Sequence, residues 1–363
     1  MTKQIAIVID SLAGGGAEKV MLTLAQTMLQ GGHNVHLLVL QNFGLYEVPD
    51  NLPVHYWKAS KNERCDALWG MDKLTQEFLV WVQGIQRHEG KFDLFISNLD
   101  KSNLLMSRSQ LEPTYFVVHN AVAEELKKER RLGPVKYFKM WRAKKALDGK
   151  KLITVSHGIQ KEIQTSGFIH PQSVQTIYNP FNVEEIQLQA QAQVKGLPQG
   201  DYMVHVGRFA KQKRHDILFQ AMREMDSELP MVLLCNNTSK AKKMAKQYGV
   251  EDRIILPGFQ ANPYPWIKHA RLLALSSDCE GLPTVLIESL ICGTPVVSTD
   301  CPHGPNEIMT GPLAEFLVPC RDPKSLAKAM DRALEVYPDA QTAEILSQVS
   351  AENVTQSYLA LAD

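Results

Sequence analysis

The feature that most constrains the fold is an alternation, along the whole chain, of short apolar runs with longer helical patterns. The runs are rich in leucine and β-branched residues and nearly continuous in apolar character, which is typical of strands covered on both faces, as in parallel sheets. The predicted strands are 5–9, 35–40, 94–97, 115–118, 152–155, 203–206, 232–235, 254–256, 272–275, 296–298 and 316–318. Helical patterns at 17–30, 217–225 and 323–336 lie between them, so the sequence predicts an α/β fold of doubly wound parallel sheets.

The series of strands restarts near residue 200, and this restart predicts two domains. The 363 residues exceed the usual length of one domain and suit two domains of about 150 to 200 residues each. The polar stretch 186–200 contains no predicted strand and follows the turn signal Asn179-Pro180. We therefore expect one domain over 1–180 and a second over 181–340. The remaining segment, 341–363, has the pattern of a single helix that packs back toward the first domain.

Composition narrows the class of protein. Lys and Arg total 39, as do Asp and Glu, whereas a general polyanion binder usually has a basic excess; we expect no nucleic-acid partner. The six cysteines form no C-x-x-C pair and are expected to be free thiols in a reducing compartment. The apolar run at 5–9 is too short for a signal peptide, and no run approaches the ~18 apolar residues of a membrane span. We expect a cytoplasmic protein.

The most informative motif is the stretch 276–290, where a predicted strand ends, a short loop follows and a helix begins near Pro283. Proline suits a first helical turn, Gly281 allows a ligand to approach the backbone, and the helix start favours a diphosphate. Glu280 and Glu288 lie on the two sides of this site, and carboxylates accept hydrogen bonds from hydroxyls. The pattern predicts a nucleotide-sugar site. The alternative is two unrelated glutamates, one capping the helix and one on its surface.

A second motif, Val206-Gly207-Arg208-Phe209-Ala210-Lys211-Gln212-Lys213, follows the first predicted strand of the second domain. Arg208 and Lys213 lie in a loop that leads into a helix, where two cations can neutralise a diphosphate as it leaves. The alternative is a solvated basic loop.

Together these motifs resemble glycosyltransferase family 4, whose members have the GT-B fold of two Rossmann-like domains. The resemblance runs through the whole chain. Its pieces are Gly14-Gly15-Gly16-Ala17-Glu18, the Val-Gly-Arg…Lys loop, Leu256-Pro257-Gly258-Phe259, the Glu-Gly-Leu-Pro…Glu element and Gly293-Thr294-Pro295-Val296-Val297-Ser298. The run Asp300-Cys301-Pro302-His303-Gly304-Pro305-Asn306-Glu307-Ile308 resembles a subgroup that builds bacterial surface polysaccharides and lipid-linked glycans. Two places depart from the family pattern: 311–315 looks altered, and His303 replaces a residue that is often small.

The resemblance implies roles for particular residues in the second domain, the nucleotide-sugar domain. Arg208 and Lys213 would contact the donor phosphates, Glu280 the transferred sugar and Glu288 the ribose. Backbone groups that would touch sugar and phosphate are those of Gly281, Leu282 and Pro283. Phe259 would lie where the base is held.

In the first domain, which would bind the acceptor, the resemblance implies two further elements. His119 would face the donor sugar near the anomeric centre; the alternative is a core histidine. The loop that includes Gly15 and Gly16 would close on the phosphates and the acceptor.

The resemblance also implies the reaction. The family is retaining, and a front-face route would let the leaving phosphate accept the acceptor's proton. No Asp-x-Asp motif is present, so we expect neither a metal nor another cofactor, only a nucleotide-sugar co-substrate. The expected donor is a UDP-sugar carrying galactose, GalNAc or GlcNAc, and the expected acceptor a glycan or lipid-linked saccharide in surface polysaccharide or lipopolysaccharide synthesis. Two alternatives are a nucleotide-sugar epimerase and a non-catalytic sugar-nucleotide-binding subunit.

Residues 124–151 carry the densest positive charge, interleaved with Tyr137, Phe138, Met140 and Trp141. Phe138 and Trp141 would share one face of a helix. A basic amphipathic helix of this kind predicts peripheral contact with an anionic membrane, at the inner face of the plasma membrane. The alternative is a solvated helix whose aromatic face packs into the first domain.

Overall fold

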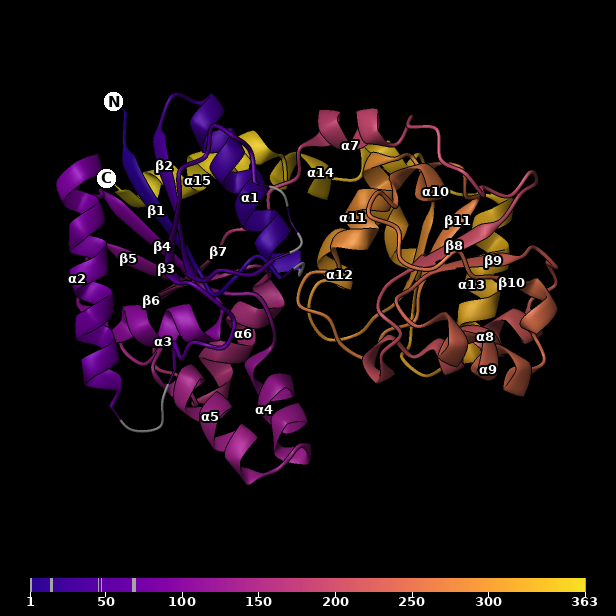
Figure 1. Ribbon diagram of the computed structural model, residues 1–363. Helices are drawn as coiled ribbons and strands as arrows, with labels where there is room; N and C mark the ends of the chain where they lie inside the picture. The colour runs from indigo at the N-terminus through magenta and orange to yellow at the C-terminus, as the bar shows by residue number, and fades with distance from the viewer. Residues whose placement is uncertain (1, 14–15, 45, 47, 67–69, 363) are drawn as a thin grey trace. The chain divides into compact units, whose positions relative to one another are not determined.

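The chain forms two compact units in the structure, a computed structural model that describes residues 2–13, 16–44, 46, 48–66 and 70–362 (Figure 1). The first unit comprises Met1–Phe181 and Val349–Asp363, and the second comprises Asn182–Gln348. The second unit thus extends past the expected limit at residue 340, and the shorter segment after it belongs to the first unit.

The first unit contains a parallel sheet, which has seven strands among the described residues. They are β1 (Gln4–Ile9), β2 (Asn34–Gln41), β3 (Val54–Lys58), β4 (Leu94–Asn98), β5 (Thr114–Val118), β6 (Lys151–Thr154) and β7 (Ser173–Thr176). Their order is β3-β2-β1-β4-β5-β6-β7, so the chain moves outward from β1 in one direction and then from β4 in the other. Right-handed crossovers of such a sheet place helices on both of its faces, which is the doubly wound arrangement predicted.

The helices of the first unit cover this sheet. They are α1 (Gly16–Gln30), α2 (Met71–Glu89), α3 (Asp100–Ser109), α4 (Val122–Arg131), α5 (Pro134–Lys145), α6 (His157–Ser166) and α15 (Ala351–Leu359), followed by the 3-10 turn η5 (Ala360–Ala362). Helix α1 packs against β2 and α15, whereas α3 packs against α2, α5 and β4.

The second unit repeats the architecture with a six-stranded parallel sheet among the described residues. Its strands are β8 (Met203–Val206), β9 (Met231–Leu234), β10 (Ile254–Ile255), β11 (Leu272–Leu275), β12 (Val296–Thr299) and β13 (Leu317–Val318). Their order, β10-β9-β8-β11-β12-β13, is that of the first six strands of the other sheet. The predicted α/β class is confirmed in both units.

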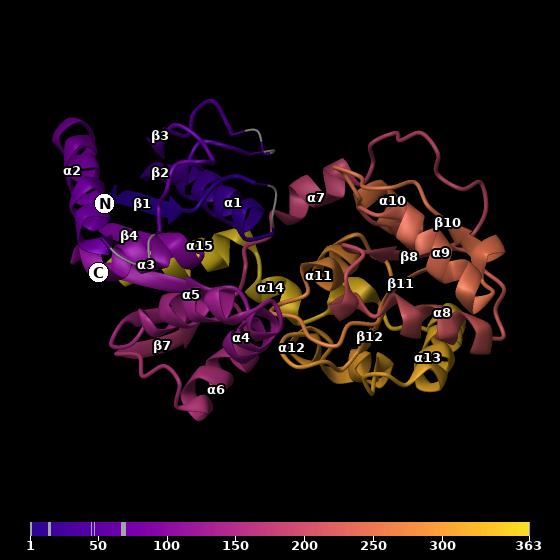
Figure 2. The same ribbon diagram turned by 60° about the horizontal axis from the view of Figure 1, so that its bottom comes forward.

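Helices cover both faces of the second sheet (Figures 1 and 2). They are α7 (Val183–Gln189), η1 (Lys211–Lys213), α8 (His215–Glu224), α9 (Thr238–Tyr248), η2 (Glu251–Arg253), α10 (Tyr264–Lys268), α11 (Thr284–Ile291), α12 (Pro305–Ile308), η3 (Gly311–Phe316), α13 (Pro323–Glu335), η4 (Ala340–Thr342) and α14 (Ile345–Gln348). One layer contains α8, α9 and α13, and the other contains α7, α10, α11 and α14.

Two helical predictions are wrong in detail. The predicted single helix after residue 340 is broken where the chain pairs with Phe181 and re-enters the first unit. Phe181 N donates to Val349 O at 2.8 Å, and Ala351 N donates to Phe181 O at 3.0 Å. Ser350 then caps α15 by accepting from Asn353 N at 3.2 Å. The basic segment is likewise two helices, α4 and α5, interrupted at Leu132 and Gly133 rather than one.

Candidate active site

The loop after β8 brings a lysine back toward the end of that strand. A Cβ added to Gly207 would lie 3.3 Å from Lys213 Cε, which shows how closely the loop folds on itself. Lys213 ends the turn η1, and Arg214 then adopts a left-handed φ of 48° before α8 begins. The Arg208 side chain is exposed and has no ion pair or hydrogen bond with the described residues. Both predicted phosphate-binding cations therefore come from this one loop, and Arg208 is available to a ligand.

The loop after β11 brings Glu280 to Lys213. Glu280 Oε1 accepts from Lys213 Nζ at 2.7 Å and from the Ser277 hydroxyl. The two charged side chains are only 16 % and 10 % exposed, so the ion pair is shielded from solvent. Within the described part of the chain, the other carboxylate oxygen, Oε2, accepts no hydrogen bond. One oxygen of Glu280 is thus fixed in place, and the other is open to a ligand hydroxyl.

The place of this ion pair in the sheet is informative. β8 and β11 are adjacent, but the chain leaves them toward opposite edges of the sheet. Ligands of open α/β sheets bind beyond the carboxyl ends of the strands at such a switch point. A cation and a carboxylate in contact there can bind a ligand whose anionic group is bonded directly to a hydroxyl-bearing ring.

The turn Gly281-Leu282-Pro283 leads into α11 and is buried. Pro283 is the N-cap of α11, one position before the first helical turn in which the sequence placed it. The loop after β12 supports this turn from one side: a Cβ on Gly304 would lie 2.5 Å from Pro283 Cδ, and Gly304 has a φ of 100°. The same loop accepts a hydrogen bond from Glu280 N at Pro302 O, at 3.3 Å. The position of Glu280 therefore depends on a third loop as well.

Glu288 lies on α11 beside a tyrosine that the sequence analysis did not single out. The Tyr264 hydroxyl donates to Glu288 Oε1 at 3.3 Å. Burial, and then the nearby Glu288 carboxylate, raise the pKa of Tyr264, so its hydroxyl stays protonated and acts as a donor. Phe259, in the connection between β10 and α10, is 77 % exposed. Its ring is free of the core and has a face on which a base could stack.

In the first unit, His119 follows β5 and bonds to Asn98 at the end of β4, with 3.0 Å between Nε2 and Oδ1. Burial, and then the charge of Lys144, lower the pKa of His119 to about 4, so the imidazole is neutral near pH 7. Gly16 is the first residue of α1 and is exposed. Gly15 lies outside the described residues.

A half-buried aspartate directly after β1 was also missed. Asp10 Oδ1 accepts from the backbone N–H and the hydroxyl of Ser102, both at 2.7 Å, and so caps the start of α3. Burial raises the pKa of Asp10 to about 6. Asp10 directly follows β1, and Asn98 ends the adjacent strand β4; these two strands form the switch point of the first sheet.

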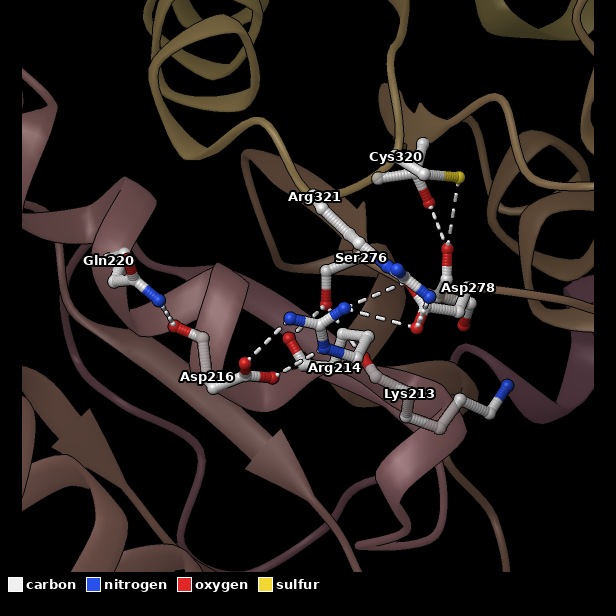
Figure 3. Close-up of polar contacts among 10 residues, drawn as sticks. Lys213, Arg214, Asp216, Gln220, Ser276, Asp278, Cys320 and Arg321 are labelled. Carbon is white, nitrogen blue, oxygen red and sulfur yellow. Dashed lines mark hydrogen bonds and ion pairs between the residues drawn. The ribbon is translucent and has the colours of Figure 1, made fainter.

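A charged network beside Lys213 is the largest omission of the sequence analysis (Figure 3). Arg214 Nη1 lies 3.0 Å from both oxygens of Asp278, and Arg321 Nε and Nη2 lie 3.0 Å from the same two oxygens. Asp278 and Arg214 flank residues that were singled out, but 64 positions separate them. No local spacing pattern could have indicated the pairing.

Two family models match the chain one after the other. The model described as Glycosyltransferase Family 4 matches residues 14–185, and the model described as Glycosyl transferases group 1 matches residues 189–348. The chain belongs to glycosyltransferase family 4. Together the two models span nearly all of both units, so the resemblance carried by the motifs is confirmed.

Relatives of this glycosyltransferase include two transferases from Campylobacter jejuni. One, an N-acetylgalactosamine-N,N'-diacetylbacillosaminyl-diphospho-undecaprenol 4-alpha-N-acetylgalactosaminyltransferase, is 27 % identical over 92 % of this chain and 90 % of its own. The other is a GalNAc-alpha-(1->4)-GalNAc-alpha-(1->3)-diNAcBac-PP-undecaprenol alpha-1,4-N-acetyl-D-galactosaminyltransferase. It is 23 % identical over 91 % of this chain and 89 % of its own.

Among solved structures, Anabaena HepE in complex with UDP and glucose is similar to this glycosyltransferase, with a TM-score of 0.68 at 18 % identity. The match covers 99 % of this chain and 96 % of that one. Across the described residues of the glycosyltransferase, no helix combines the length and the apolar character needed to cross a membrane.

Proposed function

We propose that the protein transfers N-acetylgalactosamine from UDP-GalNAc, with retention of configuration and without a metal ion, to a saccharide linked through diphosphate to a polyprenyl lipid. The contact between Lys213 and Glu280 at the switch point carries the proposal. In a nucleotide sugar the β-phosphate is bonded directly to the sugar, so one cation and one carboxylate in contact match that junction. The two near-full-length Campylobacter relatives support GalNAc over galactose or GlcNAc.

In the proposed mechanism the protein forms no covalent bond with the substrates; its side chains bind them and stabilise charge. Lys213, Arg208 and the start of α11 stabilise the negative charge that develops on the leaving diphosphate. Glu280 binds a sugar hydroxyl through Oε2, and Glu288 binds the ribose. His119, being neutral, offers a hydrogen bond to a substrate hydroxyl without adding charge. In the front-face route the leaving phosphate oxygen takes the proton of the acceptor hydroxyl.

The first experiment measures thermal stabilisation by a panel of UDP-, GDP- and ADP-sugars in EDTA. A ligand that binds only the folded state raises the melting temperature. We expect the largest shift with UDP-GalNAc, and a smaller shift in Glu280→Gln, in which the contacts of Glu288 with the donor remain. Glu315→Gln is the matched control, because Glu315 likewise pairs with a cationic side chain, that of Arg332 at 2.8 Å, elsewhere in the same unit. No shift with any UDP-sugar would contradict the proposed donor.

Turnover then distinguishes the alternatives. Radiolabelled GalNAc should pass to a polyprenyl-diphosphate-linked saccharide, with slow donor hydrolysis when acceptor is absent. Conversion of UDP-GalNAc to another free UDP-sugar would identify an epimerase, and binding with neither hydrolysis nor transfer would identify a non-catalytic subunit. A β-linked product would contradict retention.

We further propose that the α4–α5 hairpin contacts an anionic membrane, where a lipid-linked acceptor would be found. Leu132, Val135 and Phe138 are 53 %, 62 % and 50 % exposed within this basic segment, and Phe138 stacks on Trp141 with ring centroids 5.9 Å apart. Apolar side chains among cations suit the headgroup boundary of an anionic bilayer.

Sedimentation with vesicles tests the membrane contact. We expect binding to phosphatidylglycerol-containing vesicles and little binding to phosphatidylcholine alone. Val135→Ser combined with Phe138→Ser should abolish it. Val80→Ser is the control, since Val80 is 65 % exposed on α2 of the same unit. Equal binding by both variants would overturn this part of the proposal.

A further inference from the structure

Asp278 connects loops from three strands of the second unit. It lies in the loop after β11, Arg214 lies in the loop after β8, and Arg321 follows β13. Each arginine makes two contacts of 3.0 Å with the carboxylate (Figure 3). Burial alone would raise the pKa of Asp278, but the hydrogen bonds from Arg321 and Arg214 lower it, so the carboxylate stays charged.

Arg214 occupies a position where a side chain is unfavourable. Its φ of 48° is left-handed, a conformation that glycine adopts without steric cost. Its guanidinium is bound on both sides, by Asp216 at 2.9 and 2.8 Å and by Asp278. The Ser276 hydroxyl also donates to the carbonyl oxygen of Arg214 at 3.2 Å. The surrounding groups hold a strained residue in place, and such strain is often found at functional sites.

The two loops are also joined on either side of the Lys213–Glu280 ion pair. Asp278 N donates to Gln212 O at 2.8 Å, and Gln212 Nε2 donates to Cys279 O at 2.9 Å. The Ser276 hydroxyl donates to Lys213 O at 2.8 Å. The residues that neighbour Lys213 and Glu280 in sequence are therefore bonded to one another, so movement of one loop moves the other.

We propose that Asp278, together with Arg214 and Arg321, positions Lys213 and Glu280 for the donor. This inference rests on the proposed function of that ion pair. The two arginines and the two aspartates, Asp216 and Asp278, balance in charge, so the network holds the loops without adding a net charge that would compete for the diphosphate. A reactive geometry lost by about 1 Å can cost on the order of 100-fold in rate.

The test compares Asp278→Asn, Arg214→Gly and Arg214→Lys with Asp201→Asn in steady-state transfer assays at saturating acceptor. Asp201 makes an ion pair of the same length, 3.0 Å, with Arg271 in the same unit, but away from the donor loops. For Asp278→Asn and Arg214→Gly we expect kcat about 100-fold lower, with the donor KM within about 3-fold, because the contacts of Glu288 remain. Arg214→Lys should retain only part of the wild-type kcat, since an ammonium group cannot bind both Asp216 and Asp278 with paired hydrogen bonds as the guanidinium does.

Arg214→Gly separates positioning from stability. Glycine relieves the left-handed backbone, so the melting temperature should stay within a few degrees of wild type while kcat falls. A merely structural role would give the reverse: a lower melting temperature and an unchanged kcat below it. Arg321→Ala should be milder, about 5-fold in kcat, because this arginine is 68 % exposed and Arg214 still holds Asp278.

Each outcome bears on one statement. If the wild-type protein neither hydrolyses nor transfers from a donor, the proposed function fails and the inference fails with it. If the wild type is active and both Asp278→Asn and Arg214→Gly keep its kcat, the inference alone is wrong. If Asp278→Asn does not fold, Arg214→Gly decides.

Discussion

The two units use the same strand order, yet the carboxyl ends of their central strands carry different chemistry. In the second unit the loops after β8 and β11 present Arg208, Lys213 and Glu280, which are charged. In the first unit the ends of β1 and β5 present Asp10 and His119, and burial moves the pKa of each toward its neutral form, to about 6 and about 4. Near pH 7 His119 is therefore neutral, whereas a pKa of about 6 leaves Asp10 mostly ionised. The same scaffold can thus offer cations to an anion in one sheet and a neutral imidazole together with a carboxylate in the other.

The largest expected effect tests the charged end. Lys213→Met should lower kcat by about 10²- to 10³-fold, because a cation that stabilises a leaving group acts mainly in the transition state. His119→Gln, which keeps a neutral hydrogen-bonding group in the first unit, should cost about 10-fold or less. Transfer rates of the two variants under one set of conditions check the contrast. Equal losses of kcat in Lys213→Met and His119→Gln would contradict the difference between the strand ends of the two sheets.

The next effect concerns the support of the donor loop. Gly304→Ala places a Cβ 2.5 Å from Pro283 Cδ, so we expect a loss of about 2 to 3 kcal/mol in the free energy of unfolding and a raised donor KM. Gly249→Ala is the control, because Gly249 has a φ of 69° but no atom within 4 Å of the added Cβ. Denaturant unfolding of both variants separates the clash from the backbone strain, and equal losses would deny the contact a role.

The third prediction is a pH dependence that belongs to the first unit. The folded protein holds the pKa of His119 at about 4, below the ordinary 6.5, so the unfolded state binds more protons between these values. This contribution to stability is present above pH 6.5 and falls as the pH is lowered toward 4, by about 1 to 3 kcal/mol. The difference between wild type and His119→Gln, measured by denaturation from pH 7 to 4, isolates it. A constant difference would contradict the lowered pKa.

The smallest effect sharpens the assignment of Glu288. Tyr264→Phe removes one hydrogen bond to this carboxylate, so the donor KM should rise about 3- to 10-fold with little change in kcat. Tyr337→Phe also removes a tyrosine hydroxyl, which is partly buried and donates to Val296 O at 3.0 Å, and should leave the donor KM unchanged. Donor titrations at a fixed acceptor concentration give the two KM values. The same donor KM in both variants would contradict a role of Glu288 in donor binding.

Central strands could be predicted from the sequence because neighbours and helices cover them on every side. β8 and β11 were predicted with their observed bounds, Met203–Val206 and Leu272–Leu275. The edge strands β3 and β7 were missed: they are partly exposed, and neither contains a continuous apolar run.

The site shows the same division. Glu280 and Lys213 stood out because each lies in a recognisable loop, and their direct contact was not predicted. Tyr264 and Asp278 act through residues distant in the sequence, and only the folding of the sheet brings these partners together. The break at Ser350 likewise depends on a backbone bridge to Phe181, which no local pattern records.

The return of the chain to the first unit has a consequence for the order of synthesis. Helix α15 packs on α1, but residues 182–348 are translated between the two parts of that unit. At roughly 5 to 20 residues per second, the first unit waits about 10 to 30 s for its last helix while the second unit is being synthesised. Until then the surface of α1 that α15 covers is open to chaperones, and a nascent chain halted before Val349 leaves the earlier half unfinished.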